Sequence, residues 1–314
     1  MYNAGSTIIQ TLEGLEKQSY QNFEVILVDD GSKDDTISRI NKFKKKSDLH
    51  LSVSYQENAG PAKARNNGAY TAKGEILIFT DADCIPPKNW IEEMIKPIGG
   101  EIVGAHCGYD VKNKNSLVAR YIDYEIKKRH YRLYRKIIDS VGTYSFSIKK
   151  DVFNKMGGFD SSYKTASGED FAFSYKLSEN NFKIYFTDKT FVYHFHLESF
   201  LKYLKQQFYR GFWRIPLYLD NKSKITSGDS YSGYEAQIQF FAVGFLLLSF
   251  IGMYYILYLP LVFLFILYLS NINYGIFSYK YEKKMIIIAP FLASLRSLSG
   301  FFGATSGLIS FWRK

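Results

Sequence analysis

Apolar and polar positions divide the chain into an N-terminal part with alternating strand and helix patterns and a C-terminal part that is almost continuously apolar. Runs rich in β-branched and aromatic residues at 23–28 and 76–80 are typical of buried strands. A shorter strand is expected at 51–55, and helical patterns begin near Ser32 and Gly60. Alternation of this kind predicts an α/β fold built on a doubly wound parallel sheet.

The C-terminal part, residues 236–314, has the pattern of a membrane domain. No charged residue occurs in the 44 positions from Ala236 to Tyr279, whereas a single membrane-spanning helix needs about 20. Gly252 and Pro260 interrupt this run, so its two halves are expected to form an antiparallel helical hairpin. The expected hydrophobic helices cover 238–254, 256–272 and 285–312.

The third hydrophobic helix contains one charged residue, Arg296, and three glycines that would lie on one side. We expect this helix to cross the membrane, with its glycine side packed against the hairpin and Arg296 held by protein or water. The N-terminus lacks a secretory-signal pattern. The sequence therefore predicts a multi-pass membrane protein whose catalytic domain is cytoplasmic.

Charge and cysteine content narrow the possible partners. The net charge is +10 and aromatic residues make up 18% of the chain, which suits nucleic acid, an anionic membrane or a phosphorylated substrate. The chain has no zinc-finger spacing and no RNA-binding aromatic motif, so we expect no nucleic-acid partner. Cys84 and Cys107 form neither a metal-ligand pattern nor a disulfide framework, which fits a reducing compartment.

Carboxylates follow two of the expected strands. Asp29 and Asp30 end the first, and Asp81 and Asp83 follow the strand at 76–80. Ligands of open α/β sheets bind at the carboxyl ends of the strands, where two hard oxygen ligands suit Mg²⁺ or Mn²⁺ carrying substrate phosphates. The alternative is an Asp-rich turn that only ends a strand and caps a helix.

Four motifs in order resemble the inverting glycosyltransferases of family 2, which have a nucleotide-diphosphate-sugar-binding fold of the GT-A type. They are Tyr2-Asn3, Asp29-Asp30-Gly31-Ser32, the segment from Gly60 to Asn66, and Thr80-Asp81-Ala82-Asp83. The resemblance continues through Gly157-Gly158-Phe159-Asp160 and Gly168-Glu169-Asp170 and covers about the first 215 residues. It implies a catalytic domain over residues 1–220.

The resemblance assigns roles to individual residues. It implies that Tyr2, Asn3, Asp30, Arg65 and Asp81 bind the nucleotide-diphosphate sugar donor. It places Asp83 on a divalent metal, Mg²⁺ or Mn²⁺, at the diphosphate.

Two further groups complete the expected site. Asp170 falls at the catalytic base, and the N-terminus of a helix beginning near Glu169 would keep both carboxylates ionised, as a base requires. His194 and His196 would point to one face of a strand, and one of them is a candidate metal ligand. The alternative is a pair of structural histidines, and the resemblance favours His194.

The end of the catalytic domain carries candidate acceptor contacts. Arg210 and Arg214 are four residues apart on one helical face, where they would hold a lipid phosphate, and Trp213 suits the membrane interface. The basic, tyrosine-rich segment 116–138 has two interpretations. It is an amphipathic helix at an anionic membrane or acceptor groove, or a long surface helix.

One departure from the family concerns the start of the chain. The family has a buried strand just before the motif at Tyr2-Asn3, and here Met1 stands where that strand should end. Its absence would leave unpaired backbone groups inside the sheet. We therefore expect residues upstream of Met1 to supply the first strand.

The sequence predicts a membrane-anchored, metal-dependent inverting glycosyltransferase that moves a sugar from a nucleotide-diphosphate sugar to a lipid-linked or glycan acceptor. Two alternatives remain open. One is a polyprenyl-phosphate sugar synthase, whose phosphate acceptor needs no general base. The other is a non-catalytic, membrane-anchored protein that binds a nucleotide sugar or a glycan.

Overall fold

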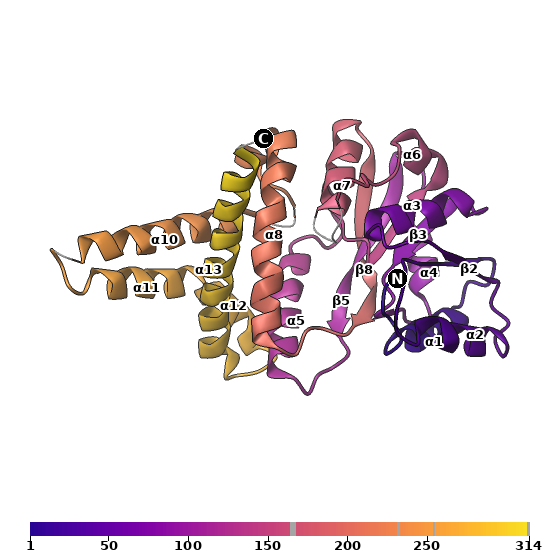
Figure 1. The fold of residues 1–314 in the computed structure, drawn as a ribbon, viewed down its shortest axis with the longest axis horizontal. Coiled ribbons are helices and arrows are strands. Elements are labelled where there is room, and N and C mark those ends of the chain that lie inside the picture. The colour runs from indigo at the N-terminus through magenta and orange to yellow at the C-terminus, as the bar shows by residue number, and fades with distance from the viewer. Residues whose placement is uncertain (164–167, 231–232, 254, 313–314) are drawn as a thin grey trace. The chain divides into compact units, whose positions relative to one another are not determined.

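The chain folds into two compact units. The computed structural model describes residues 1–163, 168–230, 233–253 and 255–312. Unit 1 comprises Met1–Lys112 and Leu133–Phe195, and unit 2 comprises Asn113–Arg132 and His196–Lys314 (Figure 1). The expected catalytic domain, residues 1–220, thus covers unit 1 and the first part of unit 2.

Unit 1 contains helices and strands in the predicted alternating order. Its helices are α1 (Ile8–Glu16), α2 (Thr36–Lys44), α3 (Pro61–Thr71), α4 (Trp90–Ile95), α6 (Lys150–Lys155) and α7 (Glu169–Glu179). Its strands are β1 (Val25–Asp29), β2 (Leu51–Tyr55), β3 (Ile76–Thr80), β4 (Cys84–Ile85), β5 (Ile102–Val111), β6 (Ile137–Ile138), β7 (Ser145–Lys149) and β8 (Lys183–His194).

The strands form two sheets. β1 and β2 pair in parallel, while the larger sheet has the order β3-β7-β5-β8-β4, with β6 beside β8. The larger sheet is mixed, because β7 runs antiparallel to both β3 and β5 whereas β5 and β8 are parallel. The α/β class is confirmed, but the expectation of a parallel sheet holds only for the β1–β2 and β5–β8 pairs. β7 enters the sheet between β3 and β5 from far along the chain, and sequence periodicity carries no information on strand direction.

Apolar side chains at the predicted periodicities form the core of unit 1. Leu12 of α1, Ile40 of α2 and Trp90 of α4 belong to one buried cluster. Phe146 of β7 and Phe153 of α6 belong to a second. These clusters hold the helices on the sheets, so that the segments after β3 and β8 are carried by a packed scaffold.

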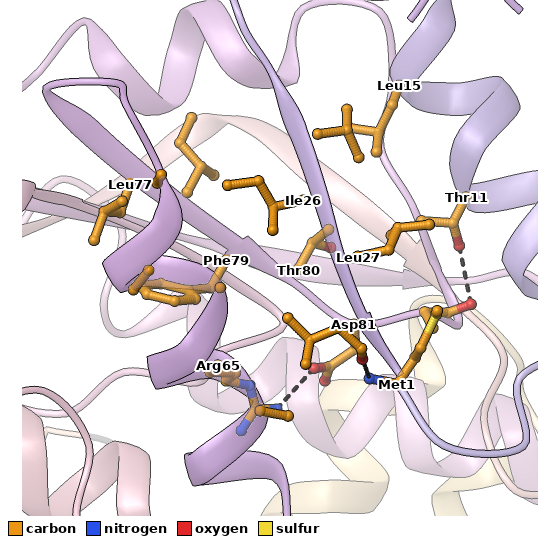
Figure 2. A pocket seen from close by; sticks show the side chains of 18 of the residues that line it. Met1, Thr11, Leu15, Ile26, Leu27, Arg65, Leu77, Phe79, Thr80 and Asp81 are labelled. Carbon is orange, nitrogen blue, oxygen red and sulfur yellow. Dashed lines mark hydrogen bonds and ion pairs between the residues drawn. The ribbon is translucent and has the colours of Figure 1, made fainter. Parts of the chain in front are cut away.

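A large cavity separates β1 from β3. It measures about 1730 Å³ and is lined by both strands. Ile26 and Leu27 of β1 lie across it from Leu77 and Phe79 of β3 (Figure 2). Among the described residues, β1 and β3 belong to different sheets, so the facing backbone edges of the two strands both border this cavity.

Met1 stands at one end of the cavity and pairs with β1. Its amino group donates to the Val28 carbonyl over 2.8 Å. The Asp30 amide donates in turn to the Met1 carbonyl over 2.8 Å. This is the hydrogen-bond pattern of a parallel bridge between Met1 and Asp29. Met1 therefore lies alongside the end of β1 and parallel to it.

Unit 2 is entirely helical within the described residues. Its helices are α5 (Leu117–Tyr131), α8 (Phe200–Asp220), α9 (Ser223–Ser227), α10 (Gly233–Gly252), α11 (Leu259–Ser270), α12 (Ile272–Tyr279) and α13 (Met285–Trp312). α8 and α13 lie side by side, and α10 and α11 form a hairpin that runs crosswise to them (Figure 1).

The hydrophobic helices differ in part from those expected. Two segments, Leu259–Tyr279 and Met285–Phe311, are long and apolar enough to cross a membrane. The second expected helix, 256–272, corresponds to α11, which begins at Leu259 and ends at Ser270, and a further helix, α12, follows it. Tyr254, at the expected end of the first helix, lies outside the described residues, as do Arg313 and Lys314.

The basic segment 116–138 forms a shorter and more buried helix than either interpretation required. Ser116 caps α5 by accepting from the Ala119 amide over 3.2 Å. The helix ends at Tyr131, and Ile137–Ile138 is a strand. Tyr121 is 1% exposed. A long surface helix is therefore excluded, because Tyr121 and Tyr124 are buried while only Tyr131 at the end of α5 is exposed.

Two expectations for α13 have different outcomes. Arg296 is held by protein, because its guanidinium donates to Glu125 of α5 and, over 2.6 Å, to Gln239 of α10. The glycine side packs against α8 and not against the hairpin, since a Cβ at Gly303 would overlap the Phe208 carbonyl. Helical spacing shows which face of a helix carries the small residues, but not which neighbouring helix packs against that face.

Candidate active site

The ends of two strands bring Asp83 and His194 together. Asp83 follows β3, and the short strand β4 that comes next pairs antiparallel with the end of β8, where Cys84 faces His194. The His194 Nε2 atom lies 3.3 Å from an oxygen of Asp83. Burial raises the pKa of Asp83, but the hydrogen bond and charge of His194 outweigh it and hold this pKa below its usual range.

The donor set at this point fits a divalent cation. Ligand atoms of Asp83, Cys84 and His194 lie within 4.8 Å of one another. A carboxylate and an imidazole are suitable ligands for Mn²⁺, whereas a thiol is too soft for Mg²⁺ or Mn²⁺. Burial and the neighbouring carboxylates raise the pKa of the Cys84 thiol well above its usual range. Asp83 and His194 are therefore the two groups of this cluster that suit the ion.

Arg65 connects the loop after β3 to helix α7. Its guanidinium donates to Asp81 over 2.8 Å and to Glu169 over 2.7 Å. Burial opposes the charge on Arg65, but Asp81 and Glu169 outweigh it and hold the guanidinium pKa above its usual range. Glu169 is 2% exposed, and its Oε1 atom accepts from Arg65. Its position suits orienting Arg65 better than accepting a proton from substrate.

Asp170 is the carboxylate at this site that is suited to proton transfer. It lies in the first turn of α7, after Gly168, whose φ of 130° is one that glycine adopts readily. Burial and the adjacent Glu169 charge raise the pKa of Asp170 to about 7, with Arg65 opposing the shift. A base with a pKa near the working pH combines ionisation with proton affinity.

The expected donor-binding residues near the N-terminus line the same cavity as Arg65 and Asp81. Tyr2 is 48% exposed. Asn3 accepts from the Lys33 amide over 2.8 Å. The Asp30 carboxylate already accepts from Gln56, Ala59 and Gly60. Asp30 therefore holds the loop just before α3, and its contact with a nucleotide base stays a prediction.

The remaining expected residues lie in unit 2. β8 ends at His194, so the strand alternation expected to reach His196 stops earlier. Arg210 is exposed on α8. Arg214 pairs with the buried Asp229 over 2.6 Å, and the Trp213 ring packs near Phe311. Among the two arginines, Arg210 is thus the one placed to meet a phosphate.

Sequence reasoning missed two groups that position the site. Tyr109 of β5 stacks on Tyr144 at 3.5 Å between ring centroids, and its ring lies 4.9 Å from that of His194. Asn66 of α3 exchanges hydrogen bonds with the Phe159 backbone and so ties α3 to the segment before α7. Tyr109 lies in an ordinary apolar strand pattern that gives no signal of a site. Asn66 belongs to the motif from Gly60 to Asn66, which could have drawn attention to it.

Comparison with known proteins gives a consistent family. The family described as glycosyl transferase family 2 matches residues 1–157. Glycosyltransferase GlyG of Streptococcus pneumoniae is 36% identical over 120 residues, which are 37% of this chain and 40% of that protein. Glycosyltransferase AglE of Haloferax volcanii is 25% identical over 70% of this chain and 72% of its own length.

A solved structure shows the same fold. The mannosyltransferase PcManGT from Pyrobaculum calidifontis, in complex with GDP-Man and Mn²⁺, has a TM-score of 0.67 and covers 99% of this chain and 85% of its own. The sequence identity is 15%, so the likeness is one of fold. The GT-A type of fold expected from the motifs is confirmed.

Proposed function

The chain belongs to glycosyl transferase family 2, and we propose that it transfers a sugar from a nucleotide-diphosphate donor to a hydroxyl of a lipid-linked or glycan acceptor, with inversion. The observation that carries this proposal is the meeting of three groups at one edge of unit 1. The first is the pair of Asp83 and His194, and the second is the ion-pair bridge from Asp81 through Arg65 to Glu169. The third is the Asp170 carboxylate, whose pKa is raised. The GDP-Man and Mn²⁺ bound to the structural relative support a nucleotide sugar and a divalent ion here.

The residues divide the reaction between them. Asp83 and His194 would hold Mg²⁺ or Mn²⁺, which supplies positive charge for the departing diphosphate when bound. Tyr2, Asn3 and Asp81 line the cavity where the donor would lie. Arg65 holds Asp81 in place beside it.

Proton transfer falls to Asp170. Its carboxylate would take the proton of the acceptor hydroxyl as that oxygen attacks the anomeric carbon from the side opposite the leaving diphosphate. The raised pKa makes this carboxylate a stronger base than an exposed aspartate while a useful fraction is still ionised at neutral pH.

The acceptor class is open to a direct test. Membranes containing the protein, supplied with a radiolabelled donor, should incorporate label into material that organic solvent extracts, if the acceptor is lipid-linked. Arg210→Ala should lower that incorporation by about 10-fold, the effect of losing one charge-assisted phosphate contact. The control is Lys42→Ala, which removes an exposed positive charge from α2 in unit 1. Label found only in the water-soluble fraction would contradict a lipid-linked acceptor.

We also propose that an extended segment continuous with Met1 fills the cavity between β1 and β3. The parallel bridge at Met1 directs that segment alongside β1, and β3 borders the cavity on the opposite side. Burial lowers the pKa of the Met1 amino group, and Arg65 adds to this effect. If Met1 were joined to a preceding residue, its nitrogen would be an uncharged amide, and burial of that amide would not require burial of a charge.

This proposal predicts that an apolar strand placed before Met1 stabilises the protein. An extension rich in Val and Ile should raise Tm by about 5 °C or more, because about 2–4 °C corresponds to each kcal/mol in a domain of this size. The control is an extension of equal length made of Ser and Gly. Equal Tm values for the two extensions, measured by thermal unfolding, would mean that the cavity does not accept a strand.

A further inference from the structure

The hairpin of α10 and α11 exposes apolar side chains along its length and at its tip. The uncharged run from Ala236 to Tyr279 includes the whole hairpin beyond the first turn of α10. At the tip, Tyr255 is 85% exposed. Further exposed large side chains are Phe241, Leu248, Ile251, Leu257, Tyr258, Leu261 and Phe265. A surface of this size and composition is unfavourable in water and requires an apolar environment.

Neither α10 nor α11 is by itself long enough to cross a bilayer. The apolar part of α10, Gln237–Gly252, falls short of the about 20 residues that a crossing requires. α11 has 12 residues, a length of about 18 Å against a hydrocarbon thickness of about 30 Å. The tip can therefore reach the interior of a bilayer, but not its far surface.

α12 does not extend the second arm, although it adds to its residue count. The helix is interrupted at Asn271, between α11 and α12. The Asn271 side chain donates to the Leu267 carbonyl over 2.9 Å. Beyond it, Tyr274 of α12 is 4% exposed. The Lys128 ammonium lies 4.2 Å from the centre of the Tyr274 ring. α12 thus belongs to the helical body of unit 2 and contacts charged groups that hydrocarbon excludes.

α13 is long enough to cross a membrane, but α8 accompanies it. Gly303 and Gly307 press against the Phe208 and Phe212 backbone, and the Ser299 hydroxyl donates to the Leu204 carbonyl over 2.7 Å. The two helices therefore occupy the same depth in any membrane.

α8 cannot be placed in hydrocarbon. Lys202, Lys205 and Arg210 are all exposed on it, and a charged side chain that faces hydrocarbon is unfavourable. Exposed apolar side chains, including Leu201 at 78%, alternate with them. This mixture is typical of a helix that lies in the interface plane. α13, packed along α8, would then lie in that plane as well.

We propose that unit 2 attaches the protein to one face of a lipid bilayer without crossing it. The tip of the α10–α11 hairpin is inserted among the acyl chains of the near leaflet. α8 and α13 lie along the headgroup region, with the exposed Lys202, Lys205 and Arg210 of α8 toward anionic lipid. The crosswise placement of the hairpin relative to α8 and α13 suits this arrangement, because one group lies in the plane while the other enters it (Figure 1). This attachment is separate from the sugar-transfer reaction, and it replaces the three crossings expected from the sequence.

Three single-cysteine variants test this arrangement. Tyr255→Cys reports the hairpin tip, and Lys283→Cys and Ser310→Cys report the two ends of α13. The native thiols, Cys84 and Cys107, are both 0% exposed, so the parent protein should give no background. A membrane-impermeant maleimide is applied to intact cells and to inverted vesicles, before and after detergent, and retained donor turnover shows that each variant is folded.

The expected result is labelling of positions 283 and 310 from the same side and of position 255 from neither side until detergent is added. Labelling of position 255 from the side opposite to 283 would mean that the hairpin crosses. Labelling of position 310 from the side opposite to 283 would mean that α13 crosses. Labelling of position 255 from the same side as 283 would place the tip in water. Each of these three outcomes overturns the proposal.

A depth measurement distinguishes lipid from a second copy of the chain as the cover of the tip. The purified Tyr255→Cys variant is labelled with bimane and reconstituted in phosphatidylethanolamine–phosphatidylglycerol vesicles. A nitroxide near the middle of the acyl chain should quench this bimane more strongly than a nitroxide on the headgroup, with the opposite order for Lys283→Cys. Weak quenching by both nitroxides at position 255 would show a protein-covered tip and overturn the proposal.

Discussion

Asp83→Asn is expected to lower metal-dependent turnover by about 10³-fold or more, because a bound cation contributes several kcal/mol to charge stabilisation and each 1.4 kcal/mol is tenfold. An amide is a neutral and weaker ligand for a hard cation. The fold should persist, since the Asp83 side chain is 43% exposed and an amide oxygen can still meet His194. Turnover is measured after chelation and titration with Mn²⁺.

The control is Asp35→Asn, which removes an exposed carboxylate that pairs with Arg39. It should leave both turnover and the Mn²⁺ requirement unchanged. Full turnover of Asp83→Asn at the same Mn²⁺ concentration would remove Asp83 from the metal site. His194→Gln then becomes the informative variant, because His194 is the other group that suits the ion.

Asp170→Asn is expected to lower kcat by about 10² to 10⁴-fold, the usual contribution of a general base, with little change in the KM for donor. In the parent protein the rate should rise with pH and level off above about 7, the value to which burial and Glu169 raise the pKa of Asp170. The variant should lose this rise. A large increase in donor KM without a fall in kcat would instead place Asp170 at the donor.

Stability provides an independent check on the same residue. The folded state holds the Asp170 proton more tightly than the unfolded chain, whose aspartate pKa is near 3.8. Ionisation of Asp170 therefore destabilises the fold progressively as pH rises from about 4 through about 7. Asp170→Asn should raise Tm at pH 8 and have a smaller effect on Tm at pH 5. A fall in Tm at pH 8 would show that the ionised carboxylate is stabilising.

The control for Asp170 is its neighbour. Glu169→Gln weakens the ion pair with Arg65 and should lower Tm, while the rise of rate with pH remains. If the acceptor were a phosphate, which has no proton to lose, Asp170→Asn would lower kcat far less. The pair of variants thus separates a base from a structural carboxylate and a hydroxyl acceptor from a phosphate acceptor.

The sequence predicted the local parts of this site well. The strand at 76–80 with Asp81 and Asp83 at its end, and the start of α7 at Glu169, follow from periodicity and capping, which are properties of short segments. The approach of His194 to Asp83 does not. It depends on β4 pairing with β8, a contact between segments about a hundred residues apart.

The larger errors share the same cause. Pairing of Arg65 with Glu169, the antiparallel β7 and the packing of the α13 glycines on α8 are all long-range contacts. A helical or strand pattern shows which face is buried but not what buries it. The burial of α5 was missed for a related reason, because its basic side chains form ion pairs such as Lys128 with Glu235 inside unit 2.

The central claim is that unit 1 turns over a nucleotide-diphosphate sugar at the site formed by Asp83, His194 and Asp170. Its most direct test is a donor screen with detergent-purified protein and extracted membrane acceptors, in which nucleoside diphosphate release is measured with Mn²⁺ or Mg²⁺. The account predicts release from at least one donor, loss of that release with a chelator and its restoration by the ion. Release that is unaffected by the chelator, or no release from any donor in the panel, would contradict it.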